Sequence, residues 1–239
     1  ADTWFDGQKY WVKDGREVWS PVLKEDFITR LRLAGFSSKP RKKGDAATEI
    51  DEVIVYVQDE RRIHGAAPFL FNFDEVVNVG PKRYINTHAH VRVLPPAADP
   101  NPELWPTLFD WFNEWMDDPR SSHYVFSWLQ HFYNGAERGD SQAGHSLIMA
   151  GDADYGKSLF ATHILPKIFS GGADAGAFLT GKENFNKELA ESAVWYVDDN
   201  ASASSLSEHR RFSEMIKKLT ASPKMTVRAM YREPVDIER

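Results

Sequence analysis

The sequence contains no cysteine among its 239 residues, so disulfide bonds and thiolate metal sites are both excluded. No apolar run approaches the ~18 residues of a membrane-spanning helix, and no charged and then apolar secretory segment opens the chain. Net positive charge is also missing, since 35 acidic residues against 29 Lys and Arg give a net charge of −6. A globally basic nucleic-acid binder is therefore excluded, whereas a local basic patch is not.

What is present is typical of a folded globular protein. Apolar residues make up 42% of the chain and aromatic residues 13%, which argues against disorder. The length suits one large domain or two small ones. Because the chain opens on Ala1 rather than Met, we expect it to be a piece of a longer protein.

The most informative stretch is the run Gly151 to Ser158, G-D-A-D-Y-G-K-S, which fits the pattern G-x-x-x-x-G-K-[ST] without a mismatch. The short apolar run 145–150 precedes it and is typical of a buried strand. The run 159–165 follows it and is typical of the first turns of a helix. A strand, a glycine-containing loop and a helix in this order predict a phosphate-binding loop.

Each residue type in this loop has a predicted task. Gly151 and Gly156 let the backbone curl so that successive N–H groups face a phosphate at the start of a helix. Lys157 is expected to reach the β- and γ-phosphates, and the Ser158 hydroxyl to bind Mg²⁺. The predicted cofactors are ATP and Mg²⁺, and the predicted nucleotide-binding residues are Gly151, Asp152, Ala153, Asp154, Tyr155, Gly156, Lys157, Ser158 and Leu159.

An acidic strand follows the loop. Residues 193–197 are apolar, and Asp198 and Asp199 come directly after them. In isolation, a strand that ends in a solvated acidic turn is the better interpretation, but its position after a phosphate loop reverses that preference. Because ligands bind beyond the carboxyl ends of parallel strands, we expect this strand to lie beside 145–150. Asp198 is then predicted to bind the metal, and Asp199 to orient or deprotonate the attacking water.

The first part of the chain mixes predicted strands and helices. Lys9 to Val12 and Arg16 to Trp19 predict a hairpin around an Asp-Gly turn. Lys24 to Gly35 and Thr48 to Asp59 have the apolar spacing of helices. Between them, the basic run Ser37 to Gly44 is better interpreted as a solvated loop than as a nucleic-acid contact or a nuclear address.

Between residues 100 and 140 the pattern is helical and aromatic. Leu104, Leu108, Trp111, Phe112 and Trp115 recur at intervals of three and four, and Asp118-Pro119 is expected to end that helix. A second helix is predicted from a further set of apolar residues, Tyr124, Trp128, Leu129 and Phe132. Such a stripe is far more often core than a platform for bases, so we assign these side chains to the core.

These patterns divide the chain into three parts. We predict a mixed α+β region over 1–98, a helical segment over 99–142 and a phosphate-loop ATPase domain over 143–239. The fold class is therefore an α/β P-loop nucleotide-binding domain, preceded by a mixed α+β and helical region.

A basic tail follows the acidic strand. Ser207 to Ala221 predicts an amphipathic helix, and Lys224 to Ile237 alternates like a hairpin that carries Lys224, Arg228 and Arg232. A basic hairpin beside a nucleotide site suits contact with a phosphate backbone. The pattern favours equally a solvated hairpin without such a function.

The order of these motifs resembles superfamily 3 helicases, above all the primase-helicases of phages, plasmids and large DNA viruses. The resemblance rests on the phosphate loop, G-x-x-x-F-N-x-x-L from Gly181 to Leu189, the acidic strand, I-K-K-L-T, and T-V-R-x-x-Y-R-E-P, and it covers about residues 80–239. It implies an AAA+-like ATPase core in the cytoplasm of a bacterial host or infected cell. The resemblance further implies that this core assembles into a homo-oligomeric ring, hexameric in the family, and moves along single-stranded DNA. The DNA-contacting residues so implied are Lys218, Lys224, Arg228 and Arg232.

The sequence also departs from that family. The second acidic residue is Asp199, where such helicases often have glutamate. The polar sensor and the arginine finger of the family would both fall after Arg239, so we expect this chain to bind nucleotide and hydrolyse it slowly. The finger is worth roughly 10³–10⁵ in rate where it operates.

Other classes of function remain as alternatives. Ser-His-Asp hydrolysis has no support because no G-x-S-x-G motif occurs. His88 and His90 fit one face of a strand, but nothing nearby completes a metal site, so a structural role is favoured. A small-molecule P-loop kinase fits poorly with the long aromatic first half. An ATP-binding assembly or origin-recruitment switch without appreciable hydrolysis is the main alternative to the helicase.

Overall fold

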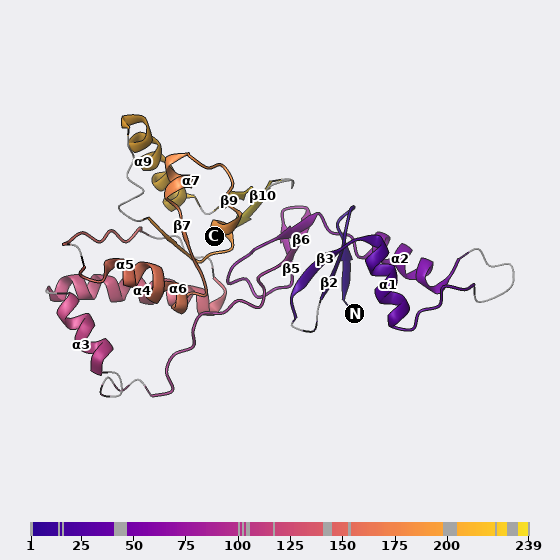
Figure 1. The fold of residues 1–239 in the computed structure, drawn as a ribbon, viewed down its shortest axis with the longest axis horizontal. Helices are drawn as coiled ribbons and strands as arrows, with labels where there is room; N and C mark the ends of the chain where they lie inside the picture. The colour runs from indigo at the N-terminus through magenta and orange to yellow at the C-terminus, as the bar shows by residue number, and fades with distance from the viewer. Residues whose placement is uncertain are drawn as a thin grey trace. The chain divides into compact units, whose positions relative to one another are not determined.

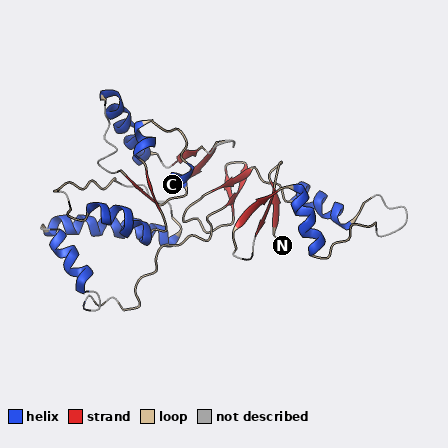
Figure 2. Ribbon diagram, viewed as in Figure 1, coloured by secondary structure: helices blue, strands red, loops and turns tan. Residues whose placement is uncertain are grey.

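The structure is a computed structural model that describes residues 2–13, 15, 17–40, 47–99, 101, 103, 106–116, 118–140, 145–152, 154–197, 205–222, 224–228 and 234–238. The chain divides into two compact units. The first comprises Ala1–Ala67 and Asp74–His90, and the second comprises Pro68–Phe73 and Val91–Arg239. Both mix helices with small sheets (Figure 2).

The first unit opens with an antiparallel sheet of β1 (Thr3–Phe5), β2 (Tyr10–Lys13) and β3 (Trp19–Val22). The predicted hairpin is confirmed, since Lys13 pairs with Trp19 and Tyr10 with Val22. Its second strand begins at Trp19 instead of Arg16, and Glu17, with a φ of 65°, lies in the connecting turn.

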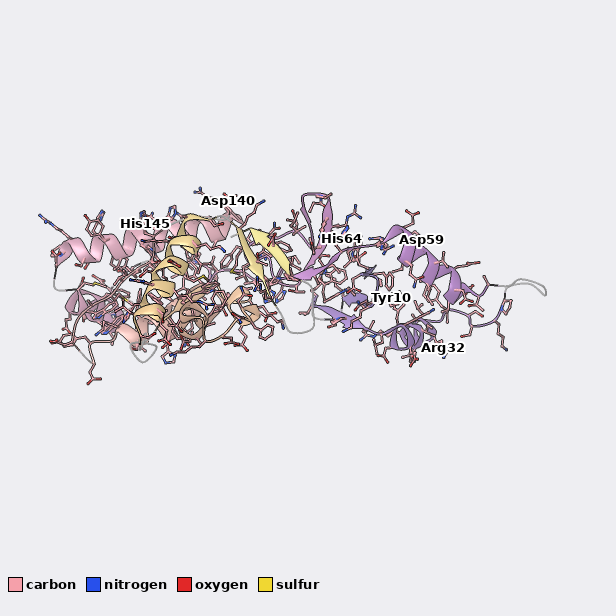
Figure 3. All side chains as sticks on the ribbon, turned by 90° about the horizontal axis from the view of Figure 1, so that it is seen from above. Tyr10, Arg32, Asp59, His64, Asp140 and His145 are labelled. Carbon is pink, nitrogen blue, oxygen red and sulfur yellow. The ribbon has the colours of Figure 1, made fainter. Side chains whose placement is uncertain are left out.

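Helices α1 (Lys24–Leu33) and α2 (Glu49–Glu60) supply the other half of this core (Figure 1). Their predicted apolar faces are confirmed, because Phe27, Leu31, Ile50, Ile54 and Val57 are buried in one cluster with Tyr10. Tyr10, labelled on β2 in Figure 3, stacks on Phe27 with ring centroids 4.4 Å apart, and its hydroxyl accepts a hydrogen bond from Gln58 Nε2.

A second small sheet completes the first unit. It consists of β4 (Gly65–Ala67), β6 (Lys82–Asn86) and β5 (Val76–Val79) in that spatial order, with β4 parallel and β5 antiparallel to β6. Ile85 from its central strand is fully buried with Trp11, Trp19 and Ile63. This cluster joins the two sheets of the unit.

The second unit begins with the aromatic helices α3 (Pro106–Trp115) and α4 (Pro119–Arg138). The predicted break is confirmed, because the Asp118 side chain accepts the Arg120 N–H at the start of α4 and Pro119 is its first residue. Trp128 and Phe132 pack in the core as predicted. Tyr124 does not, since its side chain is 71% exposed, and its assignment to the core was wrong.

After α4 come a helical run and a set of short elements (Figure 1). The run consists of α5 (Lys157–Leu159), the π-helical segment η2 (Phe160–Ile164) and α6 (Leu165–Ile168). It is followed by β7 (Gly172–Asp174), α7 (Gly176–Thr180), α8 (Lys187–Ala190), β8 (Val194–Tyr196), α9 (Leu206–Ala221), β9 (Lys224–Val227) and β10 (Val235–Glu238).

The predicted strand over 145–150 is not found. These residues form neither helix nor strand, and the acidic strand β8 pairs in parallel with β7 instead of with this run. Leu147 and Met149 pack against the core, whereas Ile148 between them is 88% exposed. The apolar run therefore has the alternating burial of a strand but no partner strand among the described residues.

The tail agrees better with its sequence pattern. Phe212, Met215, Ile216 and Leu219 of α9 pack against Leu179, Leu189 and Trp195, as the amphipathic pattern predicted. β9 and β10 pair antiparallel, with Met225 and Val227 buried and Lys224 and Thr226 exposed. Within the described residues, no helix combines the length and the apolar character needed to cross a membrane.

The N-terminus of α2 generates the first testable prediction. Thr48 and Asp51 form a capping box, in which Thr48 Oγ1 accepts the Asp51 N–H at 3.2 Å and the Thr48 N–H donates to the Asp51 carboxylate at 2.9 Å. We expect Thr48→Ala to lower the free energy of unfolding by about 1 kcal/mol in urea denaturation. Thr29→Ala on α1 is the matched control, because the Thr29 hydroxyl only bonds the Glu25 carbonyl of its own helix.

The same box gives this prediction a pH dependence. Hydrogen bonds from the Thr48 hydroxyl and N–H lower the pKa of Asp51 below its ordinary value. The contribution of the Asp51 carboxylate is therefore present at neutral pH and is lost as the pH falls through that lowered pKa. The difference between wild type and Thr48→Ala should shrink in the same acidic range. An equal loss in Thr29→Ala would contradict the role of the box.

Candidate functional site

The loop from Gly151 to Ser158 has the curled backbone that its sequence predicted. Gly151, Asp154 and Gly156 have φ angles of 153°, 63° and 84°, in the region that side chains disfavour. Gly156 directly precedes Lys157, where the helical run starts, and the Phe160 N–H donates to the Gly156 carbonyl at 2.9 Å. Ala153 lies outside the described residues.

Lys157 turns back over this loop. Its Nζ atom donates to the Gly151 carbonyl at 3.0 Å and to the Asp152 carbonyl at 2.5 Å, so the ammonium group lies against the curled backbone. The side chain is half-buried, whereas Ser158 beside it and Tyr155 before it are exposed. The structure thus brings together Gly151, Asp152 and Lys157 in one small loop.

The aromatic helix α3 supports the same loop through a contact that no sequence pattern indicated. A Cβ atom at position 156 would lie only 3.0 Å from Trp111 Cζ2. Trp111 stacks on Trp115 with ring centroids 5.0 Å apart, and Trp115 packs on Phe160 at 5.1 Å. Phe160 is fully buried. The glycine before Lys157 is therefore constrained both by its φ angle and by the Trp111 ring.

The helical run after the loop contains a wide turn that the sequence did not reveal. In η2 the Leu165 N–H donates to the Phe160 carbonyl, five residues back, which is the π-helical pattern. Pro166 follows, and because it has no N–H it cannot continue the α-helical pairing to the turn before it. Such wide turns occur mostly singly within α-helices and frequently at functional sites.

The predicted acidic residues come at the end of β8. Asp198 and Asp199 lie outside the described residues, so their roles stay predictions. β8 runs parallel to β7, with Tyr196 opposite Asp174. The Asp174 carboxylate is at this same carboxyl end, but it accepts the Gly176 N–H at 2.8 Å and so caps α7.

The predicted DNA-contacting residues lie in the tail. Lys218 on α9, Lys224 at the start of β9 and Arg228 after it are all exposed, and Arg232 lies outside the described residues. The hairpin is tied to the rest of the unit by Asn186, which is 3% exposed. Asn186 Nδ2 donates to the Thr226 carbonyl at 2.9 Å, and its Oδ1 accepts the Arg228 N–H at 2.6 Å.

The histidines show no shared site in the described part of the chain. The His88 and His90 rings lie 6.2 Å apart, and His88 Nδ1 is 2.9 Å from the Thr87 hydroxyl. His145, labelled in Figure 3, lies beside the middle of α4, because its carbonyl accepts the Trp128 indole N–H at 2.7 Å. Among the described residues, no three His, Asp or Glu side chains are grouped so as to hold a metal ion.

Comparison with known proteins gives a family match over part of the chain and a fold. Residues 149–239, which include the phosphate loop and the basic hairpin, match a family of unknown function (DUF5906). No curated protein matches the chain. Two apo structures of the C-terminal region of NrS-1 superpose with TM-scores of 0.60 and 0.62 at 17% and 16% sequence identity.

The chain shares the fold of that NrS-1 region. The matches cover 99% of this chain and 51% of each NrS-1 chain, so the present chain spans about half the length of the structures it resembles. At this sequence identity, the structural similarity shows only that the two chains share an arrangement of helices and strands. The chemistry of the site therefore rests on the residues described above.

The contact between Trp111 and Gly156 leads to a stability prediction. Gly156→Ala places a methyl group both at a φ of 84° and against the Trp111 ring, so it should cost more than backbone strain alone, which is about 1–2 kcal/mol. The matched control is Gly35→Ala, where φ is 94° and nothing lies within 4 Å of the added atom. Equal losses of unfolding free energy in the two variants would contradict a close Trp111 contact.

The Asn186 clamp leads to a second prediction for the site. Asn186→Leu keeps the branched side-chain shape but removes the acceptor of the Arg228 N–H and the donor to the Thr226 carbonyl. Leaving these partly buried groups unpaired costs about 1–3 kcal/mol, so amide exchange at Arg228 should be at least about fivefold faster. The control is Asn184→Leu, an exposed neighbour that should leave this exchange unchanged. Unchanged exchange in both variants would show that the clamp does not hold the hairpin.

Proposed function

We propose that this chain is the ATP-dependent DNA helicase module of a viral or mobile-element replication protein, which couples ATP hydrolysis to movement along single-stranded DNA. The observation that carries the proposal is the position of Lys157 Nζ against the Gly151 and Asp152 carbonyls, inside the curled loop. Triphosphate oxygens are acceptors like these carbonyls but carry full negative charge. This position supports a role for the ammonium group in binding phosphates at the loop.

The hydrolytic part of the proposal assigns a role to each polar residue. Lys157 binds the β- and γ-phosphates and stabilises charge on the transferring group. The Ser158 hydroxyl and the Asp198 carboxylate hold Mg²⁺, which neutralises negative charge on the phosphate oxygens. Asp199 orients or deprotonates the attacking water. The oxygen donors of Ser158 and Asp198 fit the preference of Mg²⁺ for hard ligands.

The DNA part of the proposal rests on the basic tail. Lys218, Lys224 and Arg228 are exposed on α9 and at the two ends of β9, and Arg232 falls in the same hairpin sequence. Cations on such a hairpin neutralise backbone phosphates without reading base sequence. By resemblance to superfamily 3 helicases, copies of the chain assemble into a ring, a hexamer in that family, around the strand.

The test is ATP turnover, measured as phosphate release with and without single-stranded DNA. We expect turnover that single-stranded DNA stimulates, and we expect Lys157→Ala to lower it by at least about 10²-fold, the usual cost of losing a transition-state donor. The matched control is Lys167→Ala, an exposed lysine on α6 in the same helical run, which should keep full turnover.

The other outcomes separate the alternatives. ATP binding that Lys157→Ala abolishes, without turnover under either condition, would contradict the motor and favour the assembly or origin-recruitment switch. Transfer of the phosphoryl group to a small metabolite would favour the P-loop kinase. Equal turnover in the Lys157→Ala and Lys167→Ala variants would remove the phosphate loop from the reaction altogether.

A further inference from the structure

The loop between α7 and α8, residues 181–186, carries the exposed aromatic ring of Phe185, which does not pack in the core. Phe185 is 46% exposed and lies outside the cluster that Leu179, Leu189 and the apolar face of α9 form beneath it. The loop folds back on α7, because the Glu183 N–H donates to the Ala177 carbonyl at 3.1 Å. Phe185 is thus held at the surface by a loop with a defined backbone.

A basic side chain of α9 packs at the start of this loop. Gly181 has a φ of 81°, and a side chain there would overlap the Arg211 guanidinium group, which lies directly against the glycine. Arg211 is exposed on its other side. Lys182, the next residue of the loop, is also exposed.

A second basic residue is fixed at the end of the loop. Asn186, next to Phe185, donates its backbone N–H to the Arg228 carbonyl at 3.2 Å and accepts the Arg228 N–H on its Oδ1 at 2.6 Å. Residues 181 and 186 are separated by five peptide units, a distance of at most about 18 Å. One short loop therefore brings together the Arg211 contact, the Phe185 ring and the Arg228 backbone.

The charges around Phe185 are not cancelled by fixed ion pairs in the described part of the chain. There, no carboxylate lies within ion-pair distance of Lys182, Arg211 or Arg228, whereas Lys187 pairs with Glu191 at 3.3 Å. An exposed ring can stack on a nucleic-acid base, and cations on both sides of its loop can neutralise the phosphate backbone of the same strand. A protein interface favours a contiguous apolar patch, but the loop residues before Phe185 are Lys182, Glu183 and Asn184.

We propose that the α7–α8 loop is a binding site for single-stranded nucleic acid, in which Phe185 stacks on a base and Arg211 and Arg228 contact the adjoining phosphates. This deepens the proposed function and rests on it, since it identifies a second contact surface beside the basic hairpin. Asn186 is a positioning residue here, because its hydrogen bonds fix the hairpin beside the stacking ring.

The test measures the affinity for a fluorescein-labelled oligothymidylate by anisotropy over a series of salt concentrations. Phe185→Leu should weaken binding about tenfold at every salt concentration, because stacking carries no charge, and Phe185→Trp should retain it. Arg211→Gln should reduce the slope of log K against log salt by about 0.7, the value for one phosphate contact on a single strand. The matched control is Tyr124→Leu, which removes another exposed ring, on α4, and should leave binding unchanged.

The outcomes separate this inference from the proposed function. A wild-type chain that does not bind the oligonucleotide contradicts the DNA part of the proposed function itself. Wild-type binding that Lys224→Gln weakens and Phe185→Leu leaves intact overturns only the stacking site. Photocrosslinking with 5-bromodeoxyuridine gives a direct check, since mass spectrometry should place the adduct on Phe185. Adducts elsewhere and none on Phe185 would overturn the inference, and folded variants are verified by circular dichroism.

The same assay distinguishes the kinds of strand. An oligouridylate competitor tests RNA, and a hairpin duplex of mixed sequence tests double-stranded DNA. We expect both single strands to compete through Phe185, because every base has a face on which an aromatic ring stacks. The duplex should compete poorly, because its bases are already stacked on one another, and equally strong competition by the duplex would contradict stacking.

Discussion

Burial of Phe160 is the constraint on which the geometry of the phosphate loop depends. The side chain is fully buried and contacts Trp115 and Phe112, which in turn pack with Trp111. Because Phe160 lies three residues after Lys157, this packing fixes the first turn of the helical run. The Trp111 ring against Gly156 then fixes the loop from the other side. The end of the loop at Gly156, where φ is positive, is therefore supported by aromatic side chains as well as by backbone hydrogen bonds.

In the same unit, the C-terminal end of that helical run is hydrogen-bonded to the segment that precedes α3. The Leu94 N–H donates to the Ile168 carbonyl at 2.7 Å, and the Leu94 carbonyl accepts the Tyr133 hydroxyl at 2.8 Å. One short segment thus connects α6 with α4. The predicted phosphate loop, the aromatic helices and the segment around Leu94 therefore belong to the same compact unit.

Much of this arrangement follows from local patterns. Helices α1, α2, α4 and α9 could be predicted because apolar spacing and capping residues act within one element. The run 145–150 could not, because a strand is defined by its partner, and apolar composition does not distinguish Leu147 and Met149, which pack in the core, from Ile148, which is exposed. The Trp111 contact with Gly156 joins segments about 45 residues apart and has no local signal. The phosphate loop was recognisable because its backbone demands glycine at fixed positions. The roles of Asp198 and Asp199 stay predictions.

The wide turn at Phe160–Ile164 divides the helical run into two halves that are oriented separately. One extra residue in a helix shifts the faces on either side of it by about 100° around the axis. The half that carries Lys157 is oriented by Phe160, whereas the half that contains Pro166 is oriented by the bond from Leu94 to Ile168. The orientation of each half is therefore determined by different neighbouring residues. The wide turn between them lets the run change the direction of its side chains by this angle while its backbone stays helical.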